Sequence, residues 1–274
     1  MNCAWNELLA ILPQDLREET DKLGRESLQE LRLREGKTAI FALQKGILES
    51  GRIMESKDLR YVLSAASRYS PWSSESISQG YLTAPGGHRI GICGETILEG
   101  NEPKGIRTVR SLNIRVARDI PGVADGFHCD GNVLVLGPPG SGKTTFLRDY
   151  IRKLSREYKV SVVDERGELF PRDFSTGLHT DILLGCPKRQ GIEMLLRTMS
   201  PQYIAVDEIT AAADCDVLRS ALWCGVRILA TAHASGIEDL KHRMVYRPLW
   251  DSGMFDTFVI LRPDQTWYTE RREV

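Results

Sequence analysis

The spacing of hydrophobic residues follows two different patterns along this chain, and the pattern changes near residue 125. In the first part, apolar positions at helical spacing alternate with short strand-like runs and glycine- or proline-rich turns. The pattern predicts helices over residues 4–11, 14–23 and 56–70. It predicts a strand pair over 28–43, a break at 71–74, a hairpin over 77–97 and a strand over 111–118. We therefore expect a small α+β domain over residues 1–125.

After residue 125, short and uninterrupted apolar runs alternate with longer amphipathic segments. The runs predict strands over 132–136, 159–164, 203–208 and 226–233, with two more near the C-terminus. The segments predict helices from 142–144 to about 157, and over 189–199, 214–224 and 236–246, with an irregular stretch between 165 and 188. This alternation is typical of a mostly parallel sheet flanked by helices, so we expect an α/β domain over residues 126–274.

The composition of the chain mainly excludes certain classes of protein and kinds of site. The 36 Lys and Arg residues balance 37 Asp and Glu, so no overall basic charge points to nucleic acid or to anionic lipid. No apolar run is long enough to span a membrane, and the first twenty residues predict an amphipathic helix instead of a signal peptide. The six cysteines form neither a C-x-x-C pair nor a zinc-finger spacing. We expect a cytoplasmic protein with reduced thiols and no metal beyond one that accompanies a nucleotide.

The run at 137–144 satisfies the pattern G-x-x-x-x-G-K-[ST]. It consists of Gly137, Pro138, Pro139, Gly140, Ser141, Gly142, Lys143 and Thr144, and Thr145 follows it. Small residues in this order let backbone N–H groups face phosphate oxygens, at the positive end of a helix. Lys143 would reach the β- and γ-phosphates, and the Thr144 hydroxyl would bind Mg²⁺. Because the run follows an apolar strand and opens a long helix, it predicts a binding site for ATP.

Two acidic residues, Asp207 and Glu208, end the strand expected over 203–208. Ligands of open α/β sheets bind at the carboxyl ends of the strands, which places this pair beside the phosphate loop. Asp207 would hold Mg²⁺ through water, and Glu208 would orient and deprotonate an attacking water molecule. The alternative is a pair of acidic residues that merely caps a strand. We expect hydrolysis of ATP.

The next strand ends in Thr231 and His233, which would bind the γ-phosphate or the attacking water. A histidine with a purely structural partner at that strand end is the alternative.

A further acidic cluster, Asp164, Glu165 and Glu168, follows the strand over 159–164. Its members would help to bind Mg²⁺ or water, with Asp164 and Glu165 as the functional pair. Alternatively, they would form ion pairs with Arg166 and Arg172.

Several longer runs together resemble one family, the stage III sporulation AA proteins, which are related to the type II and type IV secretion ATPases. In the second part these are "GPPGSGKTTFLRD", "SVVDERGEL", "GCPKRQGIEMLLRTMSPQYIAVDEI" and "ATAHAS"; in the first part, "LQELRLREGK", "QGYLTAPGGHRIGICGE" and "SLNIRVAR". The resemblance implies a RecA-like P-loop ATPase core behind a small α+β domain.

Carried over by position, the resemblance assigns the nucleotide site to Lys143, Thr144, Asp207 and Glu208. "VVDER" takes the place of the acidic box of the secretion ATPases, and His233 that of their histidine box. The acidic box lacks its usual proline, Val-Asp-Glu stands where a Gly-Glu pair is common, and no zinc-binding cysteine motif is present.

The resemblance also implies partners and a place in the cell. Secretion ATPases form hexameric rings, and this family belongs to endospore-forming bacteria. It implies a homo-hexamer on the mother-cell side of the membrane, bound to membrane-embedded channel proteins that connect the mother cell with the forespore. A ring needs arginines that complete a neighbouring site, and Arg115 is our first choice among Arg89, Arg107, Arg110, Arg115 and Arg118.

Two other functions remain open at this point. A RecA-like motor on single-stranded nucleic acid would need a basic groove with aromatic platforms, and only "RYSPWS" combines the two in a compact run, so nucleic acid is not the expected partner. A nucleotide-controlled binding switch with negligible turnover is disfavoured by Glu208, because a switch has less need of a positioned base. An ABC transporter lacks its LSGGQ-like signature here, and the 66 residues after Glu208 fit an AAA+ helical lid poorly.

Overall fold

The computed structural model describes residues 3–67, 80–171 and 174–272, so the predicted break at 71–74 lies outside the described residues. The chain forms two compact units. Unit 1 comprises Met1–Asp119 with Arg172–Phe174, and unit 2 comprises Ile120–Pro171 with Ser175–Val274. The division between the two units lies a few residues N-terminal to the boundary that we expected after residue 125. Among the described residues, no helix is long and apolar enough to cross a membrane.

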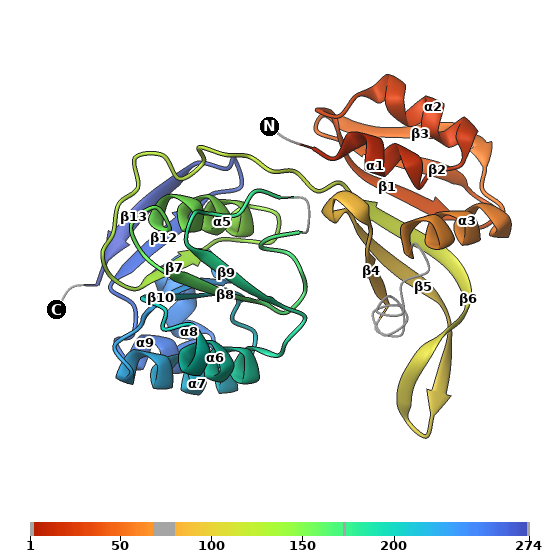
Figure 1. The fold of residues 1–274 in the computed structure, drawn as a ribbon. Coiled ribbons are helices and arrows are strands. Elements are labelled where there is room, and N and C mark those ends of the chain that lie inside the picture. Colours follow the sequence, from red (N-terminus) through yellow and green to blue (C-terminus); the bar gives the residue numbers. More distant parts are fainter. Residues whose placement is uncertain (1–2, 68–79, 172–173, 273–274) are drawn as a thin grey trace. The chain divides into compact units, whose positions relative to one another are not determined.

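Unit 1 is a six-stranded antiparallel sheet with helices (Figure 1). Its strands are β1 (Leu28–Arg34), β2 (Thr38–Leu43), β3 (Gly46–Ile53), β4 (Tyr81–Thr83), β5 (Arg89–Glu99) and β6 (Glu102–Arg115), in the spatial order β3-β2-β1-β6-β5-β4. Its helices are α1 (Trp5–Ala10), α2 (Gln14–Leu23) and α3 (Ser56–Ser67). The core between sheet and helices includes the fully buried Leu8, Leu31, Phe41, Leu59 and Ile114. The three predicted helices are therefore present.

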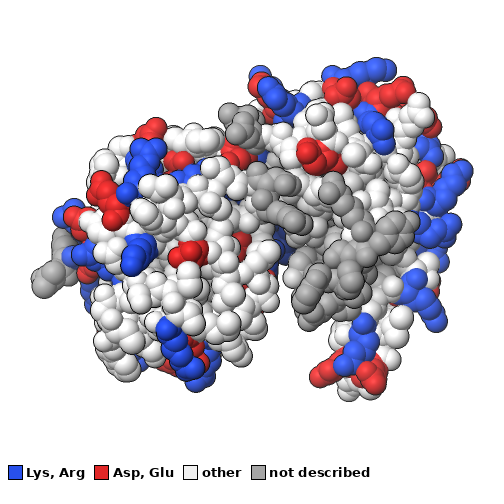
Figure 2. Space-filling view, viewed as in Figure 1, with Lys and Arg blue, Asp and Glu red and all other residues white. Residues whose placement is uncertain are grey.

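Two strands of unit 1 differ from the prediction. Strand β3 was not predicted, and β6 begins at Glu102 instead of near residue 111. Both lack the alternation of buried and exposed positions, because β3 is a sheet edge and the outer half of the β5–β6 hairpin projects from the sheet (Figure 1). At the hairpin tip, Lys104 pairs with Glu99 at 3.5 Å and Glu102 at 3.9 Å, and Figure 2 shows basic and acidic side chains mixed there.

Unit 2 is a seven-stranded sheet between two layers of helices (Figure 1). Its strands are β7 (Val133–Leu136), β8 (Val160–Asp164), β9 (Thr180–Leu184), β10 (Tyr203–Glu208), β11 (Arg227–Ala232), β12 (Thr257–Leu261) and β13 (Trp267–Arg271). Helix α5 (Lys143–Leu154) covers one face, and the other face carries α6 (Lys188–Thr198), α7 (Ala212–Trp223), α8 (Ile237–His242) and α9 (Arg247–Asp251). The strand order is β13-β12-β7-β11-β10-β8-β9, and only β13 runs antiparallel. The predicted mostly parallel sheet flanked by helices is confirmed.

Two predictions for unit 2 were wrong. The stretch expected to be irregular contains β9, a half-exposed edge strand whose apolar run is only three residues long. The helix expected over 236–246 ends at His242, and α9 follows as a separate helix. Arg243 leaves the helical conformation while its guanidinium binds Asp239 at 2.8 and 3.0 Å. The break buries Tyr246 beside β11, where it reaches the backbone of His233.

The fold brings the predicted chemistry to one edge of the sheet of unit 2. Parallel strands have their carboxyl ends at the same edge, where ligands of such sheets bind. The order β7-β11-β10-β8 therefore sets the phosphate loop after β7 beside His233 after β11, then Asp207 and Glu208 on β10, then Asp164 on β8. A continuous row of polar groups results from segments that are far apart in the sequence.

Candidate nucleotide-binding site

The phosphate loop has the backbone that its glycines predict. Gly140 (φ +77°) and Gly142 (φ +94°) lie in the left-handed region, where residues with a Cβ are strained. A Cβ on Gly137 would collide with the Ser141 hydroxyl and would lie 3.0 Å from the Leu261 carbonyl oxygen. Ser141 Oγ is buried and has no hydrogen-bond partner among the described residues. The loop is thus tightly packed, with an unpaired hydroxyl that suits a polar ligand such as phosphate.

Lys143 is folded back onto its own loop. Its Nζ donates to the carbonyl oxygens of Gly137 and Pro138, both at 2.9 Å, and lies 2.9 Å from Nδ1 of His233. Burial lowers the pKa of Lys143, and the carboxylates of Glu208 and Asp207 oppose this effect. All three ammonium protons therefore have acceptors, and phosphate oxygens would take the place of these acceptors when a nucleotide binds.

Thr144 and Asp207 meet at the position expected for a metal. The Thr144 hydroxyl donates to Asp207 Oδ1 at 3.2 Å. Burial raises the pKa of Asp207 to about 6, and the nearby carboxylate of Asp164 adds to the rise. Hydroxyl and carboxylate oxygens are the ligands that Mg²⁺ prefers, together with phosphate and water. The described residues contain no group of three His, Cys, Asp or Glu side chains that would hold a metal without such additional ligands.

His233 connects the lysine with the glutamate. Its Nε2 lies 3.1 Å from Glu208 Oε1, while its Nδ1 faces the Lys143 ammonium. Since an ammonium can only donate, Nδ1 is the acceptor and the ring proton lies on Nε2, directed at the carboxylate. The backbone N–H of His233 donates to the Tyr246 hydroxyl at 3.1 Å. The imidazole is therefore held at both ring nitrogens, and Tyr246 holds the backbone of the same residue.

Asp164 builds a loop instead of facing the nucleotide. It is fully buried, and its carboxylate accepts the backbone N–H groups of Glu168 at 2.9 Å, Leu169 at 3.0 Å and Phe170 at 2.9 Å. Burial raises the pKa of Asp164, and these N–H groups oppose the rise. Arg148 on α5 donates to the carbonyl oxygens of Glu168, at 2.8 Å, and of Leu169. The two charged side chains thereby fix the backbone that follows β8.

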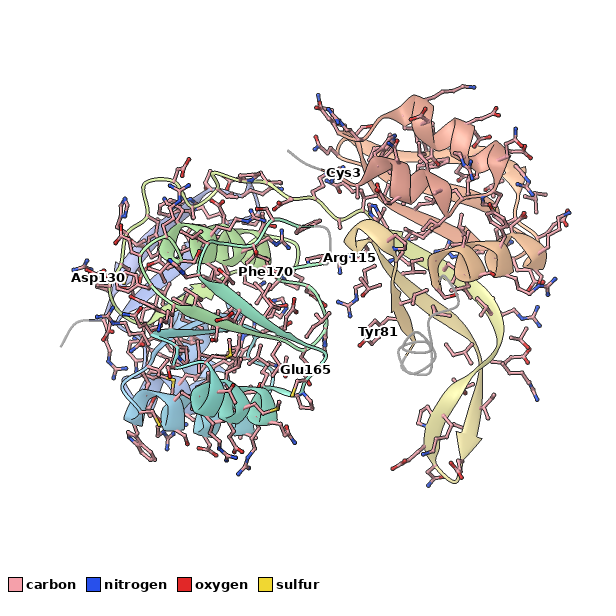
Figure 3. The ribbon with its side chains drawn as sticks, in the orientation of Figure 1. Cys3, Tyr81, Arg115, Asp130, Glu165 and Phe170 are labelled. Carbon is pink, nitrogen blue, oxygen red and sulfur yellow. The ribbon has the colours of Figure 1, made fainter. Side chains whose placement is uncertain are left out.

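Glu165 follows β8 directly (Figure 3) and forms an ion pair with Lys188 at 2.8 Å. Lys188 begins α6 and also lies 3.9 Å from Asp214. Glu165 and Arg166 line a small cavity together with Lys188, Asp207 and Glu208. The acidic cluster therefore adjoins the predicted catalytic pair, although its first two members are engaged by backbone amides and by a lysine. The alternative partner Arg172 lies outside the described residues.

Three residues of the site had not been singled out. Arg148 and Lys188 had a weak signal, since both lie within the runs that resemble the sporulation family. Tyr246 had none, because it stood inside an expected surface helix. The positions of Gly137–Thr145, Asp207, Glu208 and His233 had been predicted, and the structure brings them together at one sheet edge.

The candidate arginines belong to unit 1. Arg115 ends β6 (Figure 3), where it pairs in register with Glu30 and Arg89. Four of the five have partners within unit 1: Arg107 and Arg110 bind Glu95, Arg118 donates to Leu28 O, and Arg89 lies 5.1 Å from the Tyr81 ring. The side chain of Arg115 is exposed and has no hydrogen bond or ion pair within the described part of the chain. Its role as a finger stays a prediction.

Comparison with known proteins places the chain in a family. The family described as "Sporulation stage III, protein AA" matches residues 4–269. The Stage III sporulation protein AA of Bacillus subtilis (strain 168) is 33% identical over 278 residues, covering 93% of this chain and 90% of that protein. A relative at lower identity, the uncharacterized protein ycf45 of Cyanidium caldarium, is 25% identical and covers 59% of this chain and 53% of its own length.

Solved structures with the same fold include an ATPase and a pilus retraction motor. The ATPase DotB of Legionella pneumophila superposes with a TM-score of 0.59 at 17% identity, covering 95% of this chain and 80% of DotB. The pilus retraction motor PilT with bound ADP gives a TM-score of 0.63 at 14% identity, covering 90% of this chain and 77% of PilT. At such identities the likeness shows the fold alone, which is the RecA-like fold with an N-terminal domain. From the match over residues 4–269 and the 33% identity, the chain belongs to the sporulation stage III protein AA family.

Proposed function

We propose that this protein is an ATPase and that hydrolysis takes place at the edge of the sheet in unit 2. The observation that carries the proposal is the chain of contacts from Lys143 through His233 to Glu208, at 2.9 and 3.1 Å. These contacts join Lys143, which in this proposal binds phosphate, with Glu208, which in this proposal activates water. The likeness to DotB and PilT, both described as ATPase or motor, supports the proposal.

Each side chain of the site has its own role in the proposed reaction. Lys143 leaves the carbonyl oxygens of Gly137 and Pro138 and binds the β- and γ-phosphates, with the N–H groups of the loop, through Thr145, around them. Glu208 accepts a proton from the attacking water, and His233 holds Glu208 in place through Nε2, while its Nδ1 can accept a hydrogen bond from the attacking water. Thr144 and Asp207 would hold Mg²⁺, which neutralises phosphate charge when it is bound. Glu165 keeps Lys188 beside this group without touching the nucleotide.

We further propose that hydrolysis powers or gates a channel between the mother cell and the forespore. Membership of the sporulation family supports this context, and the fold shared with secretion ATPases supports a hexameric ring. The partners would be membrane-embedded channel proteins, and the protein would bind the membrane from the mother-cell cytoplasm.

A nucleotide-controlled binding switch is the second candidate. The contact of Lys143 with its own loop favours it, because a nucleotide must displace a set of hydrogen bonds and would thereby change the conformation of the site. The two candidates differ in turnover. A switch retains ATP, whereas a motor releases phosphate continuously.

The solution mass of the Glu208→Gln variant tests the ring. This change keeps the shape of the side chain and removes the base, so ATP stays bound. We expect a mass of about six subunits by light scattering with Mg-ATP, and a smaller species without it. A monomer at every protein concentration, with ATP bound, would contradict a ring that forms without the channel. Lys143→Ala, which cannot hold the phosphates, is the matched control.

A further inference from the structure

Transfer of a phosphoryl group needs more positive charge than Lys143 supplies, since charge builds up on the γ-phosphate oxygens and an arginine near them accelerates the reaction strongly. The other cations around the site are already engaged. Arg148 is buried and donates to two carbonyl oxygens, Lys188 is paired with Glu165, and Arg243 is held by two bonds to Asp239. None of these three is available for a phosphate without breaking its present contacts.

Arg166 differs from all of them. It is exposed, it lines the cavity that Asp207 and Glu208 also line, and it has no hydrogen bond or ion pair with any residue that the structure describes. The N–H donors of its guanidinium have no partner among the described residues. They are therefore available to a phosphate bound beside Asp207 and Glu208. No other role for Arg166 follows from its contacts.

The backbone around Arg166 is fixed on both sides. Glu165 before it is tied to Lys188, and Gly167 after it adopts φ +67° and makes the turn. The next residues, Glu168 and Leu169, are held by the Asp164 carboxylate. A free side chain on an anchored loop loses little entropy on binding, because only its own rotamers have to be ordered.

We propose that Arg166 is a catalytic residue whose guanidinium binds the γ-phosphate oxygens in the transition state. The proposal rests on the ATPase function proposed above, and it places this cation in the same chain as Glu208. A planar guanidinium offers paired N–H donors to two phosphate oxygens, which a lysine ammonium cannot reproduce. Arg166 binds the transition state more strongly than ATP, so it affects turnover more than binding.

Arg166→Ala and Arg166→Lys test the proposal, with Arg156→Ala as the control. Arg156 is also an exposed arginine of unit 2 without a side-chain partner among the described residues, but it follows the C-terminal end of α5, away from the phosphate loop. We expect kcat of both Arg166 variants to fall about 10³-fold, with the Kd for Mg-ATP unchanged within about threefold. Arg156→Ala should match the wild type. Wild-type kcat in Arg166→Ala would overturn the proposal.

Binding of a transition-state mimic gives a readout without turnover. Mg-ADP with aluminium fluoride imitates the planar phosphoryl group, and the wild-type protein should bind it at least about 100-fold more tightly than Mg-ADP alone. Arg166→Ala should lose most of this difference while its Kd for Mg-ADP stays the same. An unchanged ratio would overturn the assignment.

Mixing two inactive variants shows which chain supplies the cation. In a mixture of Glu208→Gln and Arg166→Ala, an arginine acting within its own chain leaves every site defective, so activity stays at the sum of the separate variants. Recovery of activity on mixing would show that Arg166 acts on a neighbouring chain and would overturn the proposal as stated.

If the wild-type chain does not hydrolyse ATP under any condition, the ATPase function itself fails. If it does and Arg166→Ala is fully active, only this inference fails.

Discussion

Nζ of Lys143 lies 2.9 Å from Nδ1 of His233, so one imidazole ring separates the phosphate-binding lysine from the carboxylate of Glu208. The ammonium of Lys143 donates to Nδ1 of His233, and Nε2 of His233 donates to the carboxylate of Glu208. In the proposed ATPase, phosphate oxygens would compete for Lys143, and its departure would leave Nδ1 of His233 without a donor. Nδ1 of the histidine would then be free to accept a hydrogen bond from a water molecule, while Nε2 still donates to Glu208. In the proposed ATPase, a single side chain would thus transmit the binding of nucleotide at the loop to the carboxylate of Glu208.

Replacement of His233 should separate turnover from binding. In His233→Ala, Glu208 loses its orienting partner and Lys143 loses one of three acceptors. We expect kcat to fall about 10²-fold, while the Kd for ATP stays equal or becomes lower, because less has to be broken in the empty site. Steady-state kinetics together with a direct binding measurement check this. Parallel loss of affinity and kcat would mean that His233 mainly shapes the loop.

The ionisation of Asp207 should make the empty protein less stable at neutral pH. Its pKa is raised from 3.8 to about 6 by burial and by Asp164. Below pH 4 the folded and unfolded states both carry the proton. Between about pH 4 and 6 only the folded state keeps it, so stability falls as pH rises, and above pH 6 the full cost, on the order of 3 kcal/mol, is present.

Asp207→Asn removes this cost without a change in shape. We expect the nucleotide-free variant to be more stable than the wild type at pH 7.5, and the gain to shrink at pH 5. Urea unfolding at both pH values measures it. A gain that is equal at the two pH values, or a loss at pH 7.5, would contradict this assignment.

Gly137 should tolerate no side chain. An alanine there meets Ser141 Oγ and the Leu261 backbone, so the phosphate loop must move. We expect Gly137→Ala to bind ATP at least about 100-fold more weakly, by calorimetry or fluorescence. Gly105→Ala is the control, since a Cβ at Gly105 meets nothing within 4 Å. ATP binding by Gly137→Ala at wild-type strength would show that the loop is looser than its packing indicates.

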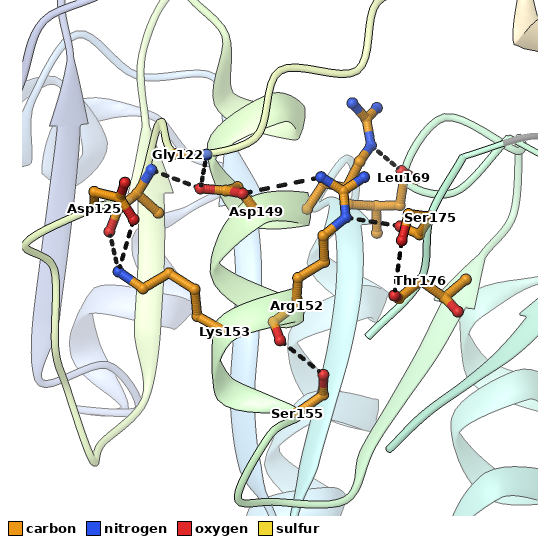
Figure 4. A network of polar contacts seen from close by, with 11 residues as sticks. Gly122, Asp125, Asp149, Arg152, Lys153, Ser155, Leu169, Ser175 and Thr176 are labelled. Carbon is orange, nitrogen blue, oxygen red and sulfur yellow. Dashed lines mark hydrogen bonds and ion pairs between the residues drawn. The ribbon is translucent and has the colours of Figure 1, made fainter. Parts of the chain in front are cut away.

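Asp149 should be a structural anchor for the helix that follows the phosphate loop. Its buried carboxylate accepts the N–H groups of Gly122 at 3.0 Å and Ala124 at 2.9 Å, so the start of unit 2 is bound to the phosphate-loop helix (Figure 4). Since the buried N–H of Ala124 and the partly buried N–H of Gly122 lose their acceptor, Asp149→Ala should lower the free energy of unfolding by about 1–3 kcal/mol.

Asp125→Ala is the matched control for this anchor. Asp125 belongs to the same network, but its carboxylate is exposed and lies 3.5 Å from Lys153. We expect a change below about 1 kcal/mol in denaturant unfolding. Equal effects of the two changes would indicate that the network is not organised around Asp149.

The positions of the site residues could be predicted where the chemistry is contiguous in the sequence or follows a buried strand. Gly137–Thr145 form one run, and Asp207, Glu208 and His233 follow apolar strands, so the parallel sheet brings them to one edge. The side-chain contacts could not be predicted. Whether Asp164 faces a metal or its own loop depends on backbone amides four to six residues away, which no pattern of residue types reveals.

The strands of the fold could likewise be predicted only in part from the sequence. Strands buried on both faces, such as β7 and β10, stand out as apolar runs. Strands β3 and β9 and the outer half of β6 are exposed, so they carry no hydrophobic period, and their pairing is set by neighbours distant in sequence. Tyr246 was missed for a related reason. Its burial depends on a helix end at His242 that the hydrophobic spacing does not mark.

Release of phosphate from Mg-ATP by the wild-type protein and by Glu208→Gln, measured side by side with the Kd for ATP, tests hydrolysis at this site most directly. We expect the wild type to turn over, alone or in its assembled form. The variant should bind ATP within about threefold of the wild-type affinity and release phosphate at least about 100 times more slowly. Equal phosphate release by the two proteins would contradict a catalytic role for Glu208, and absence of ATP binding to both would contradict the nucleotide site itself.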